Sequence, residues 1–330
     1  KKVIDKMDKV YKAWLYESYA SNPDTTFMSK KWEEFQALQD EAKKFVVNNE
    51  FSQIIDRNGG VGMNASTSWD YTNYFYSLPS NKIELWFALE AGRFMQPTYR
   101  EFYVEKEVVR EERRTRTESS PFGRLIEDFF AVAYSAHPYG RPIVGWDSDI
   151  TASTIEDAQL FYEKYYVPSN ITFGIAGDVD PKRVKELAEK YFGDMAGKGK
   201  IAPPVTTIEP EQRGERRVTI EGNTQPIIVV GYHTVEGNHP DFEPLTVLAR
   251  ILSSGRTSIL YKKLVEQQQL ALQVQNIEGI PGTRYPGLFL SLLVPNTGVG
   301  LDSLENSMYE EFELIKEGNV TQEQLDRVKT

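Results

Sequence analysis

Two acidic residues, Glu105 and Glu112, stand seven positions apart in the segment Phe102–Glu118, whose pattern predicts a helix. At about 100° per residue, steps of three, four and seven return to the same side of a helix, which therefore also carries Val108 and Val109. The pattern predicts two carboxylates within an apolar stripe that faces the interior. An anion there needs a metal ion, a cation or a hydrogen-bond donor, because an unpaired buried charge is very costly.

The same two acids have an alternative interpretation. Most acids on a helix are solvated or paired with a neighbouring cation, which here would be Lys106 or Arg116. Spacing alone leaves both interpretations open. The outer faces of the helix are predicted to hold its other charged residues, which are Glu107, Arg110, Glu111, Arg113 and Arg114.

Several other catalytic patterns are absent from the sequence. The three histidines are His137, His233 and His239, and none of them belongs to the i, i+4 helical pair that zinc hydrolases use. There is no G-x-S-x-G serine motif and no G-x-x-x-x-G-K phosphate loop. Cysteine is also absent, which excludes disulfides, thiolate metal sites and thiol nucleophiles.

Length and charge narrow the class of protein and its partners. A chain of 330 residues with 40% hydrophobic content can form about two or three domains, each with a core. The net charge of −10 argues against nucleic acid or an anionic membrane as a partner. No window approaches the roughly twenty apolar residues of a membrane span, and no signal-peptide pattern occurs. Both ends fall inside helical patterns, so we expect the chain to be a fragment.

Hydrophobic periodicity and turn residues predict the elements that position these acids. Helices are predicted over Lys1–Ala20, Lys30–Val47, Phe51–Arg57, Asn81–Gln96, Phe102–Glu118, Arg124–Tyr134, Thr154–Tyr166, Lys182–Tyr191, Asp241–Leu252, Ile259–Gln269, Leu301–Glu317 and from Thr321 onward. Strands are predicted over Gly62–Thr67, Asn73–Leu78, Ile171–Ala176, Arg217–Glu221, Ile227–His233, Ala271–Ile277 and Gly287–Leu293.

A helix, a strand pair and a helix occur in both halves of the chain, which suggests two related α/β modules in tandem. The stretch Gly197–Pro204, rich in Gly and Pro, is the predicted linker. We therefore predict an α+β fold in which each module has a mainly antiparallel sheet packed with helices. Residues 1–200 would form the first module and residues 201–330 the second.

Several short motifs follow one another along the chain. They are Gly59-Gly60, Asn64-Ala65-Ser66-Thr67, Thr72-Asn73-Tyr74, Val108-Val109, Glu111-Glu112, His137-Pro138-Tyr139-Gly140, Ile143-Val144-Gly145, Phe161-Tyr162, Tyr165-Tyr166, Gly177-Asp178 and Tyr191-Phe192-Gly193. Their order resembles the pitrilysin/insulinase metallopeptidases, in the smaller bacterial branch that is similar to mitochondrial processing peptidases. The resemblance covers residues from about 50 to 330, and the combination is specific although each piece alone is weak.

The resemblance implies one zinc ion per catalytic half. In that family an H-x-x-E-H helix supplies two histidine ligands and a general base, and a Glu on a later helix completes the set. That later ligand matches Glu112, and the family's assisting acid matches Glu105. The chain contains no H-x-x-E-H, so we expect that motif to precede Lys1. For the chain alone, zinc is expected to be weakly held or absent, and peptidase activity is not expected.

The resemblance also implies a peptide substrate. The strand Met63–Thr67 resembles the family's substrate-facing edge strand, which assigns Asn64 and Ala65 to substrate contact. A second half of the clamshell, in the same polypeptide or in a second subunit, would complete a closed chamber. The alternative is a non-catalytic partner subunit of the same fold that binds peptide or completes the chamber. The sequence leaves the compartment unknown; the family branch is compatible with a bacterial periplasmic or secreted location, and the cytoplasm stays open.

His137 and Arg284-Tyr285 also resemble family positions near the site. We interpret His137 as a packing residue rather than a metal ligand. The pair Arg284-Tyr285 follows Pro281-Gly282 in a predicted hairpin loop, so we interpret it as structural too.

Overall fold

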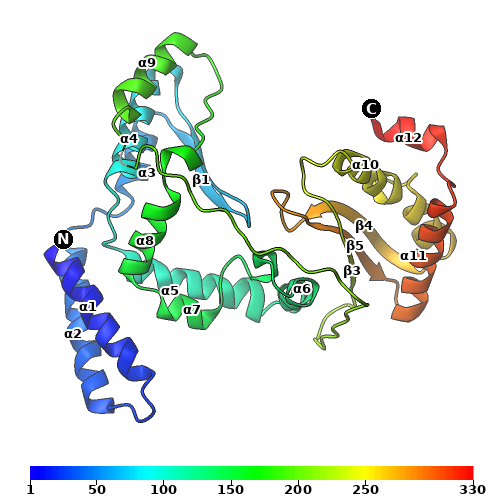
Figure 1. Cartoon of the computed structure of the whole chain (residues 1–330), viewed down its shortest axis with the longest axis horizontal. Helices are drawn as coiled ribbons and strands as arrows, with labels where there is room; N and C mark the ends of the chain where they lie inside the picture. Colours follow the sequence, from blue (N-terminus) through cyan, green and yellow to red (C-terminus); the bar gives the residue numbers. More distant parts are fainter. Residues whose placement is uncertain (196, 330) are drawn as a thin grey trace. The chain divides into compact units, whose positions relative to one another are not determined.

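The computed structural model shown in Figure 1 describes residues 1–195 and 197–329. The chain forms two compact units that interleave along the sequence. Unit 1 contains Lys1–Ser66, Asn73–Thr115 and Val144–Thr206, and unit 2 contains Thr67–Thr72, Arg116–Ile143 and Thr207–Thr330. The division of the modules at residues 200 and 201 stays a prediction. Within the part of the chain that is described, no helix is both long and apolar enough to cross a bilayer.

Unit 1 begins with a helical hairpin of α1 (Lys2–Ser18) and α2 (Thr25–Lys43), drawn in blue in Figure 1. Asp24 starts α2, because its carboxylate accepts the backbone N–H groups of Thr26 and Phe27 at 2.9 and 3.0 Å. A short helix, α3 (Glu50–Arg57), follows. The apolar stripes of α1 and α2 form one core, to which Met7, Val10, Tyr11, Leu15, Phe35, Leu38, Tyr103 and Ile155 contribute.

Next, β1 (Val61–Thr67) and β2 (Thr72–Ser77) form a two-stranded sheet, and every residue of β1 is exposed. Helix α4 (Ile83–Met95) packs with α9 (Pro181–Phe192) in the same unit.

The predicted strand over residues 171–176 is wrong, since these residues pair with no strand. Phe173 instead stacks on Phe192 of α9 at 4.6 Å between ring centroids. Alternating apolar residues fit a strand, but a strand also needs a neighbouring edge with which to pair.

The acid-bearing helix is α5 (Phe102–Arg113), and it continues into a π-helical turn, η2 (Arg114–Glu118). Two more helices of unit 1 lie later in the sequence, α7 (Asp147–Ala152) and α8 (Ile155–Tyr165). A capping box starts α8. The Thr154 hydroxyl accepts the N–H of Asp157, and the Asp157 carboxylate accepts the N–H of Thr154.

Unit 2 is built on a three-stranded antiparallel sheet in the order β3 (Ile228–His233), β5 (Leu288–Pro295), β4 (Ala271–Ile280). Val230 of β3 lies opposite Ser291 of β5, and Val274 of β4 lies opposite Leu293. The helices of this unit are α6 (Pro121–Ala133), α10 (Phe242–Ser253), the π-helical η5 (Tyr261–Gln267), α11 (Leu301–Lys316) and α12 (Gln322–Lys329). Their buried core includes Leu252, Leu264, Leu293, Leu304 and Met308.

The predicted strand Arg217–Glu221 is also wrong, because its residues join no ladder. They line a pocket of about 950 Å³ that β3 and α6 also border. The Arg217 guanidinium is held by both carboxylate oxygens of Glu305 at 2.9 and 2.6 Å. Short 3-10 helices also occur at Ser80–Lys82, Pro138–Gly140 and Pro168–Asn170. Helices packed with small antiparallel sheets confirm the predicted α+β class.

Candidate functional site

The buried side of α5 is not the side that its apolar residues predicted. Lys106 is only 5% exposed, and Tyr103 and Arg113 are buried with it, whereas Val108 is 56% exposed and Val109 is exposed too. The prediction of an inward stripe that contains Glu105 and Glu112 is therefore wrong, and so is the outward placement of Arg113. Long cationic side chains can bury their stems when their charged ends find partners, and spacing does not reveal those partners.

Lys106 finds such partners in the core of unit 1. Its Nζ donates to the Tyr11 hydroxyl at 2.8 Å and to the backbone carbonyls of Thr151 and Ser153 at 3.0 Å each. The ammonium also lies 4.0 Å from the centroid of the Tyr11 ring. Burial disfavours its charged form and lowers the pKa of Lys106 to about 8. The lysine therefore ties α5 to α1 and to the end of α7.

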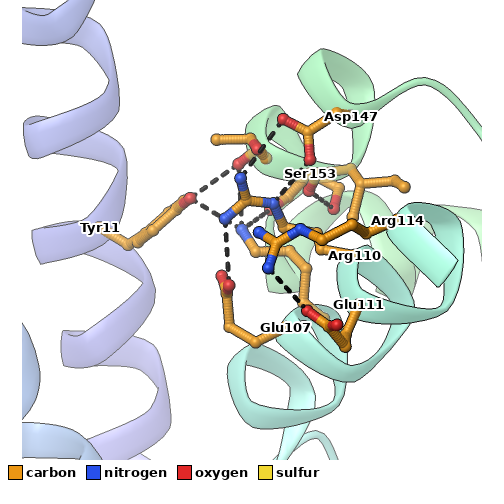
Figure 2. A network of polar contacts seen from close by, with 10 residues as sticks. Tyr11, Glu107, Arg110, Glu111, Arg114, Asp147 and Ser153 are labelled. Atoms are coloured by element: carbon orange, nitrogen blue, oxygen red, sulfur yellow. Dashed lines mark hydrogen bonds and ion pairs between the residues drawn. The ribbon is translucent and has the colours of Figure 1, made fainter. Parts of the chain in front are cut away.

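Arg110 makes the second polar attachment on this side of α5, and Figure 2 shows it between Asp147 and Glu107. Its Nε and Nη2 donate to the two oxygens of Asp147 at 2.8 and 3.3 Å, and its Nη1 donates to Glu107 at 3.0 Å. The hydrogen bond from Arg110 lowers the pKa of the Asp147 carboxyl. Nearby, Arg114 pairs with Glu111 at 2.9 Å. The contact with Asp147, together with those of Lys106, fixes how α5 is rotated within unit 1.

Glu105 and Glu112 consequently lie on the opposite, solvent-facing side of α5. Glu105 is exposed and Glu112 is half-buried, and exposed Val104, Val108 and Val109 accompany them on this face. The two acids are two turns apart, about 10 Å along the helix axis. Glu105 also lines a pocket of about 570 Å³ between residues 46–52 and the start of α5. An apolar helix face with carboxylates is thus open to a partner that packs on it.

The described residues do not form a complete zinc site. Among residues 1–195 and 197–329, no group of three or more His, Cys, Asp or Glu side chains could hold a metal ion. The ring of His137 is buried, His233 Nε2 lies 3.0 Å from the carbonyl of Ala133, and His239 Nδ1 accepts the N–H of Asp241. Glu112 is a carboxylate of the ligand type, but zinc would need further ligands from outside these residues.

The predicted substrate residues lie in the middle of the exposed strand β1. Asn64 and Ala65 are both exposed, and the Asn64 side-chain oxygen accepts the backbone N–H of Ala65 at 2.8 Å. That N–H is therefore bound locally. It becomes available to an incoming peptide carbonyl once the Asn64 side chain rotates. The structure does not bring a ligand to these residues, so their role in substrate contact stays a prediction.

The sequence analysis missed two acids that organise loops of unit 2, Asp70 and Glu209. Glu209 accepts the N–H groups of Ser135, Ala136 and His137 and the hydroxyl of Ser135, at 2.7 to 2.9 Å. Burial raises the pKa of Glu209, but these hydrogen bonds outweigh it and lower the pKa to about 2. Both acids lie in polar segments without periodicity, so no local pattern marks them.

Two family profiles each match a large part of this chain. The family profile described as "Insulinase (Peptidase family M16)" matches residues 38–147, which include β1 and α5. The profile described as "Peptidase M16 inactive domain" matches residues 153–330, more than half of the chain. The chain belongs to the M16 peptidase family. The resemblance found in the sequence is thereby confirmed.

Individual M16 relatives agree with this assignment. The chain is 33% identical over 287 residues to the zinc protease PqqE of Helicobacter pylori, covering 85% of this chain but only 64% of that protein. The crystal structure of a protease from Helicobacter pylori has a TM-score of 0.80 at 32% identity, covering 86% of this chain and 69% of that one. A probable mitochondrial-processing peptidase subunit beta from Schizosaccharomyces pombe is 25% identical over 229 residues, covering 65% of this chain and 50% of that protein.

Proposed function

We propose that this M16 chain belongs to the catalytic half of a zinc-dependent endopeptidase that acts on peptides or unfolded segments. The second half, in the same polypeptide or in another subunit, would close the chamber around the substrate. The observation that carries the proposal is the solvent-facing side of α5, where Glu105 and Glu112 lie among exposed valines. A ligand-type carboxylate on an open apolar helix face is suited to an ion held between α5 and another helix.

The two acids have unequal roles in this proposal. Glu112 would be the carboxylate ligand, and the histidine ligands would come from a segment outside this chain. Glu105, two turns away and exposed, would support the charge and orientation of the site. A bound zinc ion supplies an activated water for attack on a peptide carbonyl. β1 would bind the peptide by strand addition, with Asn64 and Ala65 in contact with it.

The test uses the longer protein that contains this chain. Glu112→Gln should remove most of the zinc, because it deletes a direct ligand. Glu105→Gln should lower peptidase activity by about 10- to 100-fold with a smaller loss of metal. Glu111→Gln is the matched control, since Glu111 is an exposed acid in the same helix that resembles no ligand position and pairs with Arg114. Equal and negligible effects of all three changes on zinc content and on hydrolysis would refute the assignment.

A non-catalytic partner subunit is the second candidate. It is supported by the match of residues 153–330 to a profile described as an inactive domain. A partner subunit would bind peptide without zinc and without hydrolysis. For the chain as given, we predict no stoichiometric zinc and no peptidase activity, and one tightly held zinc per chain in metal analysis would overturn that prediction.

A further inference from the structure

The turn between β1 and β2 is held by residues far away in the sequence. Within the turn, the N–H of Ser68 donates to the carbonyl of Tyr71 at 2.8 Å. Trp69 and Asp70 form the tip and belong to unit 2. The indole N–H of Trp69 donates to the carbonyl of Arg141 at 3.0 Å. The turn is therefore attached at its tip and does not move freely in solvent.

Asp70 makes the most extensive of these attachments. Its Oδ1 accepts the hydroxyl of Tyr139 at 2.6 Å, and its Oδ2 accepts the backbone N–H groups of Thr283 and Arg284 at 2.8 and 3.1 Å. Tyr139 is buried, and its hydroxyl oxygen accepts the N–H of Tyr285 at 3.2 Å. Hydrogen bonds to an ionised carboxylate are stronger than those between neutral groups. One side chain thus joins the turn to the loop between β4 and β5.

The fit around the carboxylate is close. A Cβ atom placed on Gly282 would lie 2.4 Å from Oδ2 of Asp70 and 2.6 Å from the hydroxyl oxygen of Tyr139. A side chain at this position would displace the Asp70 carboxylate or the Tyr139 hydroxyl, so glycine lets the loop reach the carboxylate. Asp70, Tyr139 and Gly282 are therefore packed against one another, although they come from three distant parts of the sequence.

β1 has few other constraints on its position. All seven of its residues are exposed, and it belongs to a two-stranded sheet. Such sheets are marginally stable in water by themselves. At the start of β1, the N–H of Gly60 donates to the carbonyl of Ile55 at 2.9 Å. At its other end, β1 continues directly into the turn that Asp70 holds.

We propose that Asp70 is a positioning residue that keeps β1 in the extended form to which a peptide adds. The inference rests on the proposed function, in which β1 is the peptide-binding strand. An ordered strand presents its backbone N–H and C=O groups at fixed positions, so less conformational freedom is lost when a peptide pairs with it. Asp70 acts through the turn and does not itself touch the peptide.

The first experiment measures hydrogen exchange of the β1 amides, residues 61–67, in the chain as given. In Asp70→Asn an amide group replaces an accepting oxygen and faces hydroxyl or N–H donors, so exchange should be at least about tenfold faster. Tyr139→Phe removes one of the three donors and should accelerate exchange by a smaller factor. Tyr71→Phe is the matched control, because Tyr71 lies in the same turn and is 63% exposed. It should leave exchange unchanged.

The second experiment measures peptide affinity by fluorescence anisotropy with fluorescein-labelled unfolded casein. Asp70→Asn should weaken binding by about tenfold, in line with the loss of strand order. In the longer enzyme the same change should raise KM for a peptide by a similar factor with little change in kcat. A role confined to overall stability would not produce that split.

Three results would overturn the proposal. The first is β1 exchange in Asp70→Asn equal to that of the wild type. The second is uniformly faster exchange across the whole chain, and the third is faster β1 exchange with unchanged affinity and KM. If Asp70→Asn does not fold, Tyr139→Phe, which keeps the carboxylate, decides by the same criteria. A longer protein without hydrolysis would refute the proposed function, whereas exchange and anisotropy still decide the role of Asp70.

Discussion

The clearest quantitative prediction concerns Glu209, whose carboxylate holds the loop that contains His137. Oε1 accepts the N–H and hydroxyl of Ser135, and Oε2 accepts the N–H groups of Ala136 and His137. In Glu209→Gln one of these oxygens becomes an NH2 group that faces donors. One or two of the backbone N–H groups then face a donor instead of an acceptor, depending on which oxygen is replaced, and the charge that strengthened the other hydrogen bonds is lost.

The lowered pKa of Glu209 gives the free energy with which its carboxylate stabilises the loop. A fall from the ordinary 4.5 to about 2 corresponds to about 3.4 kcal/mol at 1.36 kcal/mol per unit. The side chain is 12% exposed, so water replaces part of this interaction and we expect about 2 kcal/mol. That free energy corresponds to a factor of about 30 in the equilibrium for local opening.

The assay is hydrogen exchange of the amides of Ser135, Ala136 and His137, which are the donors themselves. At neutral pH, Glu209→Gln should accelerate their exchange by about 30-fold. Glu211→Gln, an exposed acid in the same segment, is the matched control and should leave the rates unchanged. A rate within about twofold of the wild type in Glu209→Gln would show that the carboxylate does not hold this loop.

The pH dependence of this contribution has a definite sign. Because the folded pKa of Glu209 is below the unfolded value, its stabilisation is fully present above pH 4.5 and is lost as pH falls towards about 2. After correction for intrinsic exchange, the difference between wild type and Glu209→Gln should shrink over this window. A difference that stays constant between these pH values would contradict the assigned pKa.

Two further predictions concern unit 1. The pKa of Lys106 is lowered to about 8 from 10.5, so its charged form destabilises the fold at lower pH, and the free energy of unfolding should rise between about pH 8 and 10. Urea unfolding followed by tryptophan fluorescence should show this rise in the wild type but not in Lys106→Met, and an equal rise in both would disprove it. Gly60→Ala would place a Cβ 2.3 Å from Cγ2 of Ile55 and should cost about 1–3 kcal/mol in the same assay. Gly92→Ala, in α4 with open space around it, should be neutral or slightly stabilising, and equal effects of the two changes would refute the steric argument.

The side chains that hold loops together could not be predicted from the sequence. Asp70 contacts Tyr139 and Thr283, and Glu209 contacts the backbone of residues 135–137, in each case across a long stretch of chain. Neither acid stands in a periodic or capping pattern. Hydrogen bonds between distant residues depend on the tertiary fold. Local sequence patterns do not show which distant residues become neighbours.

The sequence by itself determined where most helices begin and end, the α+β class and the family. Apolar spacing and caps such as Thr154 act within one or two turns, and family motifs are read in order along the chain. Only the tertiary structure decided which side of α5 is buried, since Lys106 and Arg110 are fixed by Tyr11 and Asp147 from other elements. It also decided that residues 171–176 and 217–221 pair with no strand. Periodicity shows which residues share a face, but burial of that face and pairing of an edge depend on the partner that arrives there.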